Sequence, residues 1–348
     1  TRCFSPARRP PSGAPPIQLV AMKKIALYYV MTLVLVAAFL GGGTELFVRT
    51  VIDDGMQFDL EMWKYARQLK FVSENATLGH EHRAGGQARL MGVDVDINNH
   101  RLRGPDIRLE PPRDKIRILM LGDSITFGWG VAEDNTVARL LEKRLTKSGH
   151  PTEVINAGVG NYNTDMEIEY FLKTGIRFKP DIVVLNFFVN DPEITPAYGN
   201  QTFLDRHSYA YVYLRSRLDL IMRQTRVRRD WKRYLNDLFN PEFEGWKVAS
   251  RRIDEFAAAA KQGGMKALLV YYPDLHELDD YPFQQSQQML QSAASKNGID
   301  FLDLMVAVRG HDEPSLWVSP TDAHPNAIAT KKFAAAIMQK LRILGWLG

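Results

Sequence analysis

The sequence predicts an α/β protein: a three-layer α/β/α sandwich around a mostly parallel sheet, preceded by one N-terminal transmembrane helix. The sandwich is predicted because short apolar runs alternate with segments of helical period along residues 115–348. The transmembrane helix is predicted because residues 25–43 carry no charge. A chain of 348 residues with 45% hydrophobic content can form a large core.

The predicted elements of the sandwich alternate regularly. The predicted strands are 116–121, 153–157, 182–188, 267–272 and 301–306. The predicted helices are 136–147, 164–178, 245–262, 283–296 and 326–344. Such alternation is typical of a parallel sheet covered by helices on both faces. Ligands of these sheets bind beyond the carboxyl ends of the strands, so the segments that follow the strands are where chemistry is expected.

The positive charge of the chain lies at its beginning. Lys and Arg number 44 against 40 Asp and Glu, a formal net charge of +4. Residues 1–24 hold five of the basic residues and no acid, which leaves 39 basic against 40 acidic residues in the rest. A near-neutral body does not offer the basic face that nucleic acid binding requires. The single cysteine, Cys3, excludes an internal disulfide and a cysteine-based zinc site.

The N-terminal segment divides into two parts. Residues 1–21 contain five prolines without an apolar period and are predicted to be a disordered leader. Residues 22–46 are predicted to be a signal anchor, because the nineteen uncharged residues 25–43 would form a helix of about 28 Å. Lys23 and Lys24 precede this run and favour a single pass through the inner (cytoplasmic) membrane with the later residues in the periplasm. The alternatives are a cleaved signal peptide and a buried core helix.

Two further regions flank or interrupt the sandwich. Residues 47–114 contain a helix-like stretch at 60–69 and an alternating run at 92–97, and are predicted to be an extension with a small hairpin packed on domain 115–348. Residues 192–243 form a long insertion rich in basic residues. These are Arg206, Arg215, Arg217, Arg223, Arg226, Arg228, Arg229, Lys232 and Arg233.

Apolar residues of the insertion recur at helical spacing and predict an amphipathic helix that covers the rim of the site. They include Leu214, Leu218, Ile221 and Met222. One interpretation of the arginines is a solvated face that pairs internally with Asp219 and Asp230. The other is a surface for anionic polysaccharide or phospholipid headgroups.

Two of the segments that follow strands could carry a nucleophile and an oxyanion site. Ser124, after Gly122-Asp123, is a possible nucleophile if a base lies within reach, and otherwise a helix cap. The turn at Gly160-Asn161 contains residue types that tolerate left-handed backbone, and such a turn can direct N–H groups at a developing oxyanion. Its alternative role is an ordinary strand-to-helix turn.

Two more segments could complete such a site. Asn190 follows the third strand and could donate its side-chain amide to the same oxyanion, or it could belong to an Asx-Pro turn. His324 precedes the last helix, and Asp322 could orient its ring and stabilise it when protonated. A lone histidine is more often structural. All four segments, however, are placed at one edge of one sheet.

Together these segments resemble the four sequence blocks of the SGNH, or GDSL-type, hydrolase superfamily, whose fold is a flavodoxin-like sandwich. The resemblance covers residues 115–348 and is closest at Gly122-Asp123-Ser124 with the following Ile-Thr-Phe-Gly. It implies catalysis by Ser124, His324 and Asp322 without a metal or cofactor. It also implies an oxyanion hole built from the Ser124 N–H, the turn at Gly160-Asn161 and the Asn190 side chain.

The sequence departs from the family pattern at three positions. Asn161 stands where the family has its oxyanion glycine, and Phe188 stands where the third block has glycine. The last block of the family has Asp-x-x-His, whereas Thr321 occupies that acid position here and Asp322 is two residues before His324. Either Asp322 reaches the ring from this position, or the site is a Ser-His dyad oriented by a backbone carbonyl.

The resemblance and the predicted anchor together imply a membrane-anchored bacterial member of the superfamily. The expected activity is that of a serine esterase or O-acyltransferase acting on acyl esters, acetyl above all, of cell-envelope or secreted carbohydrate. A lipid or lysophospholipid esterase is one alternative. An inactive SGNH-fold scaffold in an envelope polysaccharide complex is another.

Overall fold

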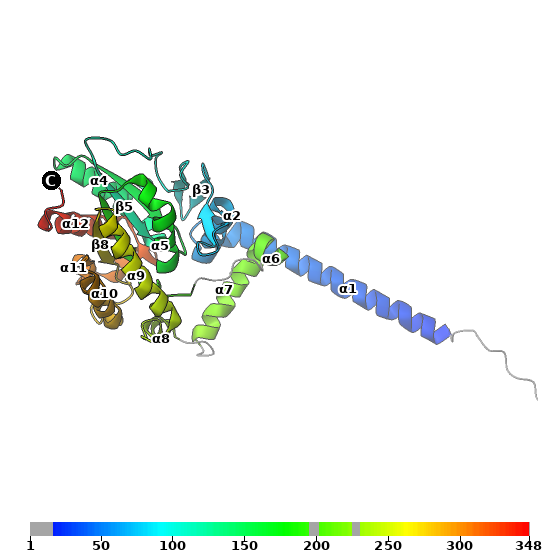
Figure 1. Ribbon diagram of the computed structural model, residues 1–348. Helices are drawn as coiled ribbons and strands as arrows, with labels where there is room; N and C mark the ends of the chain where they lie inside the picture. The colour runs from blue at the N-terminus through cyan, green and yellow to red at the C-terminus, as the bar shows by residue number, and fades with distance from the viewer. Residues whose placement is uncertain (1–16, 195–201, 225–229, 348) are drawn as a thin grey trace, which may run out of the picture. The chain divides into compact units, whose positions relative to one another are not determined.

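The computed structural model describes residues 17–194, 202–224 and 230–347 (Figure 1). The chain divides into two compact units, Thr1–Ile52 and Asp53–Gly348. In the first unit, α1 (Ile17–Phe47) continues into a π-helical turn, Val48–Ile52. Within the described part of the chain, Ala21–Ile52 is the one helix long and apolar enough to cross a membrane, and none of its apolar window is buried. This exposure fits a membrane span or a signal sequence and not a core helix.

The second unit is built on a five-stranded parallel sheet of order β6-β5-β7-β8-β9. The strands are β5 (Ile116–Gly122), β6 (Thr152–Gly158), β7 (Ile182–Phe187), β8 (Lys266–Tyr271) and β9 (Asp300–Asp303). The central strands are apolar on both faces and buried, as a sheet covered on both sides requires. Together with the helix layers, this sheet confirms the predicted fold class.

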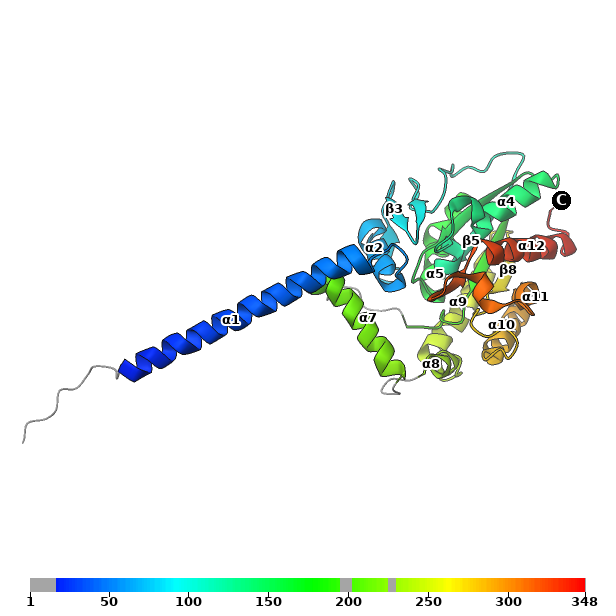
Figure 2. The ribbon, with the colours of Figure 1, turned by 180° about the vertical axis from the view of Figure 1, so that it is seen from behind.

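Helices cover both faces of the sheet. One layer pairs α4 (Val137–Lys147) with α12 (Ala327–Ile343), which lie together in Figure 2. The other layer contains α5 (Thr164–Lys173), α9 (Glu244–Gln262) and α10 (Gln284–Asn297). The short helices are α3 (Ser124–Phe127), α6 (Phe203–His207), α8 (Trp231–Asp237) and α11 (Met305–Val308), and the insertion also contains the longer α7 (Tyr209–Gln224). Three 3-10 turns lie at Glu133–Asn135, Gly175–Phe178 and Glu313–Leu316.

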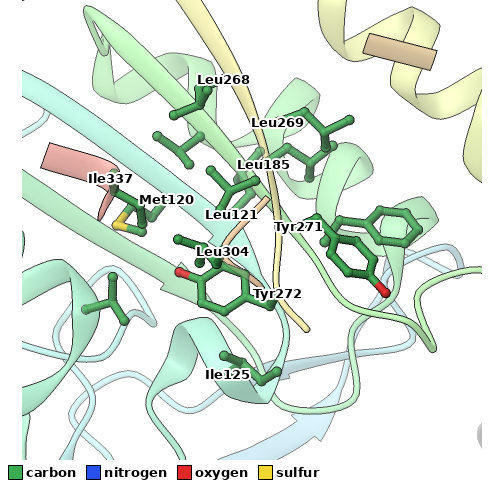
Figure 3. Close-up of a cluster of buried hydrophobic side chains, with 14 of the residues drawn as sticks. Met120, Leu121, Ile125, Leu185, Leu268, Leu269, Tyr271, Tyr272, Leu304 and Ile337 are labelled. Atoms are coloured by element: carbon green, nitrogen blue, oxygen red, sulfur yellow. The ribbon is translucent and has the colours of Figure 1, made fainter. Parts of the chain in front are cut away.

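The core lies between the sheet and its helices (Figure 3). Leu121, Leu185 and Leu269 come from three neighbouring strands, and Ile337 comes from α12. Each of these four side chains is fully buried. Such close-packed contacts hold the strand ends, and therefore the loops that follow them, in fixed positions.

Two predicted elements end earlier than the pattern suggested. The predicted helix 164–178 stops at Lys173, and a Cβ at Gly175 would lie 2.9 Å from the Leu119 side chain, so the chain turns close to the sheet there. The predicted strand 301–306 stops at Asp303, whose Oδ1 accepts the Met305 N–H at 2.8 Å and begins α11. In both cases a tertiary contact or local cap overrides the periodicity.

The residues before β5 form a small layer of their own. It contains α2 (Phe58–Leu69), the antiparallel pair β1 (Lys70–Val72) and β2 (His80–His82), and the hairpin of β3 (Gln87–Leu90) and β4 (Val93–Asp96). A second hydrophobic cluster joins Tyr65, Leu69 and Leu90 of this layer to Phe127 and Trp129, which follow β5. The extension therefore shares a core with the loop after the central strand.

Candidate active site

Ser124 lies at the carboxyl end of the central strand β5. The Asp123 side chain accepts the Ile125 N–H at 2.8 Å and caps α3, which Ser124 begins. Gly158 ends the neighbouring strand, and a Cβ there would lie 2.1 Å from the Phe127 nitrogen. Glycine thus allows the turns after β5 and β6 to touch, which brings the first two predicted segments together.

His324 and Asp322 reach Ser124 from the antiparallel pair β10 (Trp317–Ser319) and β11 (Asp322–Pro325). The Ser124 Oγ lies 2.9 Å from His324 Nε2, and His324 Nδ1 lies 2.6 Å from Asp322 Oδ1. With the Nδ1–H donated to Asp322, Nε2 accepts the Ser124 hydroxyl. Alternate residues of a strand share a face, so the Asp-x-His spacing places both side chains on the same side of β11.

Asp322 is 4% exposed and ionised. Burial alone would raise its pKa, but the hydrogen bonds from His324 and from the Trp129 indole outweigh burial, so the pKa of Asp322 is lowered. The Trp129 Nε1–H donates to the second carboxylate oxygen at 2.9 Å. Both oxygens of Asp322 therefore have donors, which fixes the carboxylate that holds the imidazole.

The predicted oxyanion donors differ in what they contact. The Gly160 N–H donates to the Tyr65 hydroxyl at 2.9 Å, so this N–H is already used. Within the described residues, the backbone N–H groups of Ser124 and Asn161 have no hydrogen-bond acceptor. The Asn190 side chain makes no hydrogen bond there either, and its Oδ1 is buried and unpaired. Asn161 has a left-handed backbone with φ 65°, as predicted for this turn. Of the two N–H groups of Gly160-Asn161, only that of Asn161 is therefore without an acceptor in the described part of the chain.

The extension holds this turn with side chains that the sequence did not mark. Lys70 Nζ donates to the Gly160 carbonyl at 2.5 Å and to Asn161 Oδ1 at 3.0 Å. His80 Nε2 lies 3.1 Å from the same carbonyl. Burial lowers the pKa of Lys70 well below its usual value, and burial together with Lys70 lowers the pKa of His80 to about 2. The hydrogen bonds of these groups go to the turn itself.

A cavity of about 250 Å³ opens beside the Ser124–His324 pair. Its walls include Phe58, Ile125 and Phe188, and the Phe58 ring stacks on His324 with centroids 5.6 Å apart. Phe188, which replaces the glycine of the family pattern, therefore takes up space in the pocket as expected. Leu275 and His276 also line the cavity and come from the loop after β8.

The described residues of the helix α7 (Tyr209–Gln224) do not line this cavity, which corrects the prediction that the amphipathic helix of the insertion covers its rim. No residue described in 192–243 lines the cavity. The helix α7 instead contacts α2: the Trp63 ring lies 4.7 Å from the Tyr209 ring, and Arg217 pairs with Asp59 at 2.7 Å.

The exposure of the apolar residues of α7 also differs from the prediction. Leu214 and Leu218 are 53% and 55% exposed, because α7 contacts α2 through other residues. Arg215 pairs with Asp205 at 2.8 Å, and Asp230 caps α8. Arg226, Arg228 and Arg229 lie outside the described residues, as does the side chain of Arg223.

Buried carboxyl groups lie next to the site residues in sequence. Asp123 precedes Ser124 and Asp191 follows Asn190, and both are buried, as is Glu167 of α5. Burial raises the pKa of all three groups, and repulsion from Glu167 and Asp123 raises that of Asp191 further. The raised pKa values favour the neutral form of each carboxyl and so reduce negative charge next to Ser124 and Asn190.

A comparison with protein families matches the part of the chain that contains these residues. A sequence profile of the GDSL-like Lipase/Acylhydrolase family matches residues 120–331, more than half of the chain. No curated protein sequence matches the chain.

Several solved structures are similar. TesA is 17% identical and aligns over 66% of this chain and 99% of its own, with a TM-score of 0.43. The lipase/acylhydrolase from Enterococcus faecalis is 17% identical over 67% of this chain and 97% of its own, with a TM-score of 0.41. A two-domain esterase active on acetylated mannans is 17% identical over 66% of this chain and 50% of its own, with a TM-score of 0.44. By its profile match, the chain belongs to the GDSL-like lipase/acylhydrolase family and is an ester-hydrolysing enzyme.

Proposed function

We propose that this enzyme is a serine esterase in which Ser124 is the nucleophile, His324 the general base and Asp322 the group that orients and stabilises the imidazole. The hydrogen-bonded chain from Ser124 through His324 to Asp322 carries the proposal. His324 takes the Ser124 proton as Oγ attacks the ester carbonyl, and then returns it to the leaving alcohol. Water, activated by the same imidazole, then releases the acid from the acyl-enzyme.

The negative charge of the tetrahedral intermediate needs donors fixed in advance. We assign this role to the N–H groups of Ser124 and Asn161 and to the Asn190 side-chain amide, because none of these has another acceptor among the described residues. Lys70 acts through the turn and not on the substrate, so it is a positioning residue.

Replacing Lys70 by Met is expected to lower kcat up to about a hundredfold and to leave KM nearly unchanged. Its hydrogen bonds hold the Gly160 carbonyl and the Asn161 side chain, and loss of one oxyanion donor typically costs 10² to 10³ in rate. Steady-state kinetics with an aryl acetate, together with the melting temperature of each variant, measures this.

Two further variants serve as a partial rescue and as a control for Lys70→Met. Lys70→Gln retains an N–H donor and should recover part of kcat. Lys64→Met is the matched control, since Lys64 pairs with Asp53 and Glu61 and does not touch the turn. A lowered melting temperature with an unchanged kcat in Lys70→Met would show that this lysine only supports the fold.

For the substrate, we infer short acyl esters, acetyl above all, of cell-envelope or secreted carbohydrate. The cavity of about 250 Å³ is smaller than the roughly 300–1,000 Å³ of sites for drug-sized ligands, and Phe58 and Phe188 narrow it. This size favours a short acyl chain over the long chain of a lipid ester. Transfer of the acyl group to a sugar hydroxyl in place of water is the second candidate reaction, because the same acyl-enzyme serves both.

One experiment tests the nucleophile and the chain length together. A fluorophosphonate should modify the full-length enzyme once, at Ser124, and abolish hydrolysis. Without the reagent, kcat/KM should fall along a series of aryl acetate, butyrate, octanoate and palmitate. Modification at another residue would refute the assignment of Ser124, and a preference for palmitate would favour the lipid esterase. Acetyl recovered on an added glycan and not as acetate would show transfer.

We further propose that residues 25–43 are an uncleaved single-pass anchor in the inner membrane, with the catalytic unit in the periplasm. Lys23 and Lys24 lie in α1 directly before its uncharged run 25–43, whose side chains are exposed. If this is correct, protease added to intact spheroplasts should digest an epitope placed at the C-terminus. Protection of the epitope would reverse the orientation, and release of the protein from membranes by alkaline carbonate would indicate cleavage.

A further inference from the structure

A second Asp-x-His pair lines the same cavity as the first. Asp274 Oδ1 accepts the His276 backbone N–H at 3.0 Å and lies 2.9 Å from His276 Nδ1. Asp322 makes the same two contacts with His324, at 3.1 and 2.6 Å. Asp274, His276, Asp322 and His324 all line the cavity, but only His324 bonds Ser124. The reaction proposed above leaves the second pair without a role.

Aromatic side chains and a backbone hydrogen bond support the second pair. The His276 ring lies between two indoles, with centroids 5.0 Å from Trp231 and 5.3 Å from Trp317. Trp317 donates its Nε1–H to the Leu275 carbonyl at 2.9 Å and so fixes the intervening residue. The Asp274 side chain is 9% exposed, whereas that of His276 is 45% exposed. His276 Nε2 contacts no hydrogen-bonding atom of the described residues, so a fixed ring presents an unused polar atom.

We propose that His276 Nε2 binds a hydroxyl group on the alcohol half of the ester, which makes this wall of the cavity a subsite for a carbohydrate ester. The inference rests on the proposed esterase and specifies its substrate class. Phe58, Ile125 and Phe188 give the same cavity an apolar lining, which suits the acyl methyl group. His276 is therefore a specificity residue and not a second base for Ser124.

The choice of a hydroxyl follows from the protonation of the ring. The hydrogen bond to Asp274 raises the pKa of His276, burial opposes this, and the charges of Asp274, Asp322 and Glu277 raise it further. Lys232 also lies near, but it is paired with Glu277. Neutral His276 accepts a hydrogen bond at Nε2, and the protonated form donates one. A hydroxyl can meet either form, whereas a carboxylate suits only the cation.

Two esters with the same acyl group test this inference in the full-length enzyme. 4-Nitrophenyl acetate has no hydroxyl in its alcohol half, and a mono-O-acetylated methyl glycoside retains several. His276→Phe keeps an aromatic ring between Trp231 and Trp317 but removes Nε2. It should lower kcat/KM for the glycoside about tenfold, which is the expected effect of losing one hydrogen bond. The kcat/KM for the aryl ester should stay within about twofold of the parent value.

Two further variants serve as references for the comparison. His276→Gln retains a polar group and should recover part of the activity on the glycoside. His311→Phe is the matched control, because His311 is exposed and bonds only the Val308 carbonyl outside the cavity, so it should change neither rate.

The outcomes separate this inference from the esterase proposal. The carbohydrate subsite would be wrong if His276→Phe lowered kcat/KM equally for both esters or for neither. It would also be wrong if the parent enzyme did not cleave the glycoside. In each of these cases Ser124-dependent hydrolysis of the aryl ester would still support the esterase. Aryl ester hydrolysis that did not depend on Ser124 would instead remove the proposed function itself.

Discussion

Replacing Ser124 by Ala is expected to lower kcat for an aryl acetate by roughly 10⁶-fold, since loss of the nucleophile alone has about this effect in serine hydrolases. The structure gives the reason: Ser124 Oγ is the atom that His324 Nε2 contacts, at 2.9 Å. The fold should persist, because Asp123 caps α3 through the Ile125 backbone and not through Ser124. The measurement is steady-state hydrolysis by the full-length enzyme, with melting temperatures alongside.

The matched control for this substitution is Ser292→Ala. Ser292 is exposed on α10, and its hydroxyl bonds only the Gln288 carbonyl of its own helix. Its removal should leave kcat unchanged. Equal rates for Ser124→Ala and the parent would show that ester cleavage occurs elsewhere, whatever the geometry of the Ser124–His324 pair.

Replacing Asp322 by Asn is expected to lower kcat about 10⁴-fold, the effect seen when a triad aspartate becomes an amide in a serine protease. An asparagine side chain can turn its NH₂ group toward His324 Nδ1, which stabilises the tautomer with the proton on Nε2. That tautomer cannot accept the Ser124 proton. The structural cause is specific, because Asp322 Oδ1 receives both the ring and the backbone N–H of His324.

Two variants make the Asp322 result decisive. Trp129→Phe removes the donor to Asp322 Oδ2 and should lower kcat only about tenfold, since the bond to His324 remains. Asp312→Asn is the control, because Asp312 caps an exposed turn away from the cavity. A loss below tenfold in Asp322→Asn would mean that Ser124 and His324 work as a dyad.

The sequence predicted the candidate catalytic residues, which follow strand ends, better than it predicted the side chains that hold the oxyanion turn in place. Ser124 and His324 lie together because parallel strands and the loops after them share one edge, and this follows from the alternation of elements. The position of Asp322 could also be rationalised once 322–325 is known to be a strand, since a period of two replaces the longer spacing of the family. The pattern alone left a Ser-His dyad open.

The support of the oxyanion turn could not be predicted in this way. Lys70 lies 90 residues before the carbonyl that it contacts, and neither its residue type nor its neighbours in sequence mark it. The same limit applies to α7, whose helical spacing was predicted but whose apolar residues Leu214 and Leu218 are exposed and do not cover the cavity. Periodicity identifies a helix and its apolar stripe, whereas the surface that the stripe meets depends on tertiary packing.

The contact of Tyr65 and Lys70 with the turn after β6 has a consequence for how this enzyme can be divided or recombined. A catalytic domain that began at residue 115 would keep Ser124, His324 and Asp322 but would lose the partners of Gly160. It would also lose six of the eight buried residues of the cluster around Phe127 and Trp129. The smallest transferable unit therefore begins near Asp53. A chimera of this enzyme must therefore keep the layer before β5 together with the sandwich, and a comparison with homologues must include both.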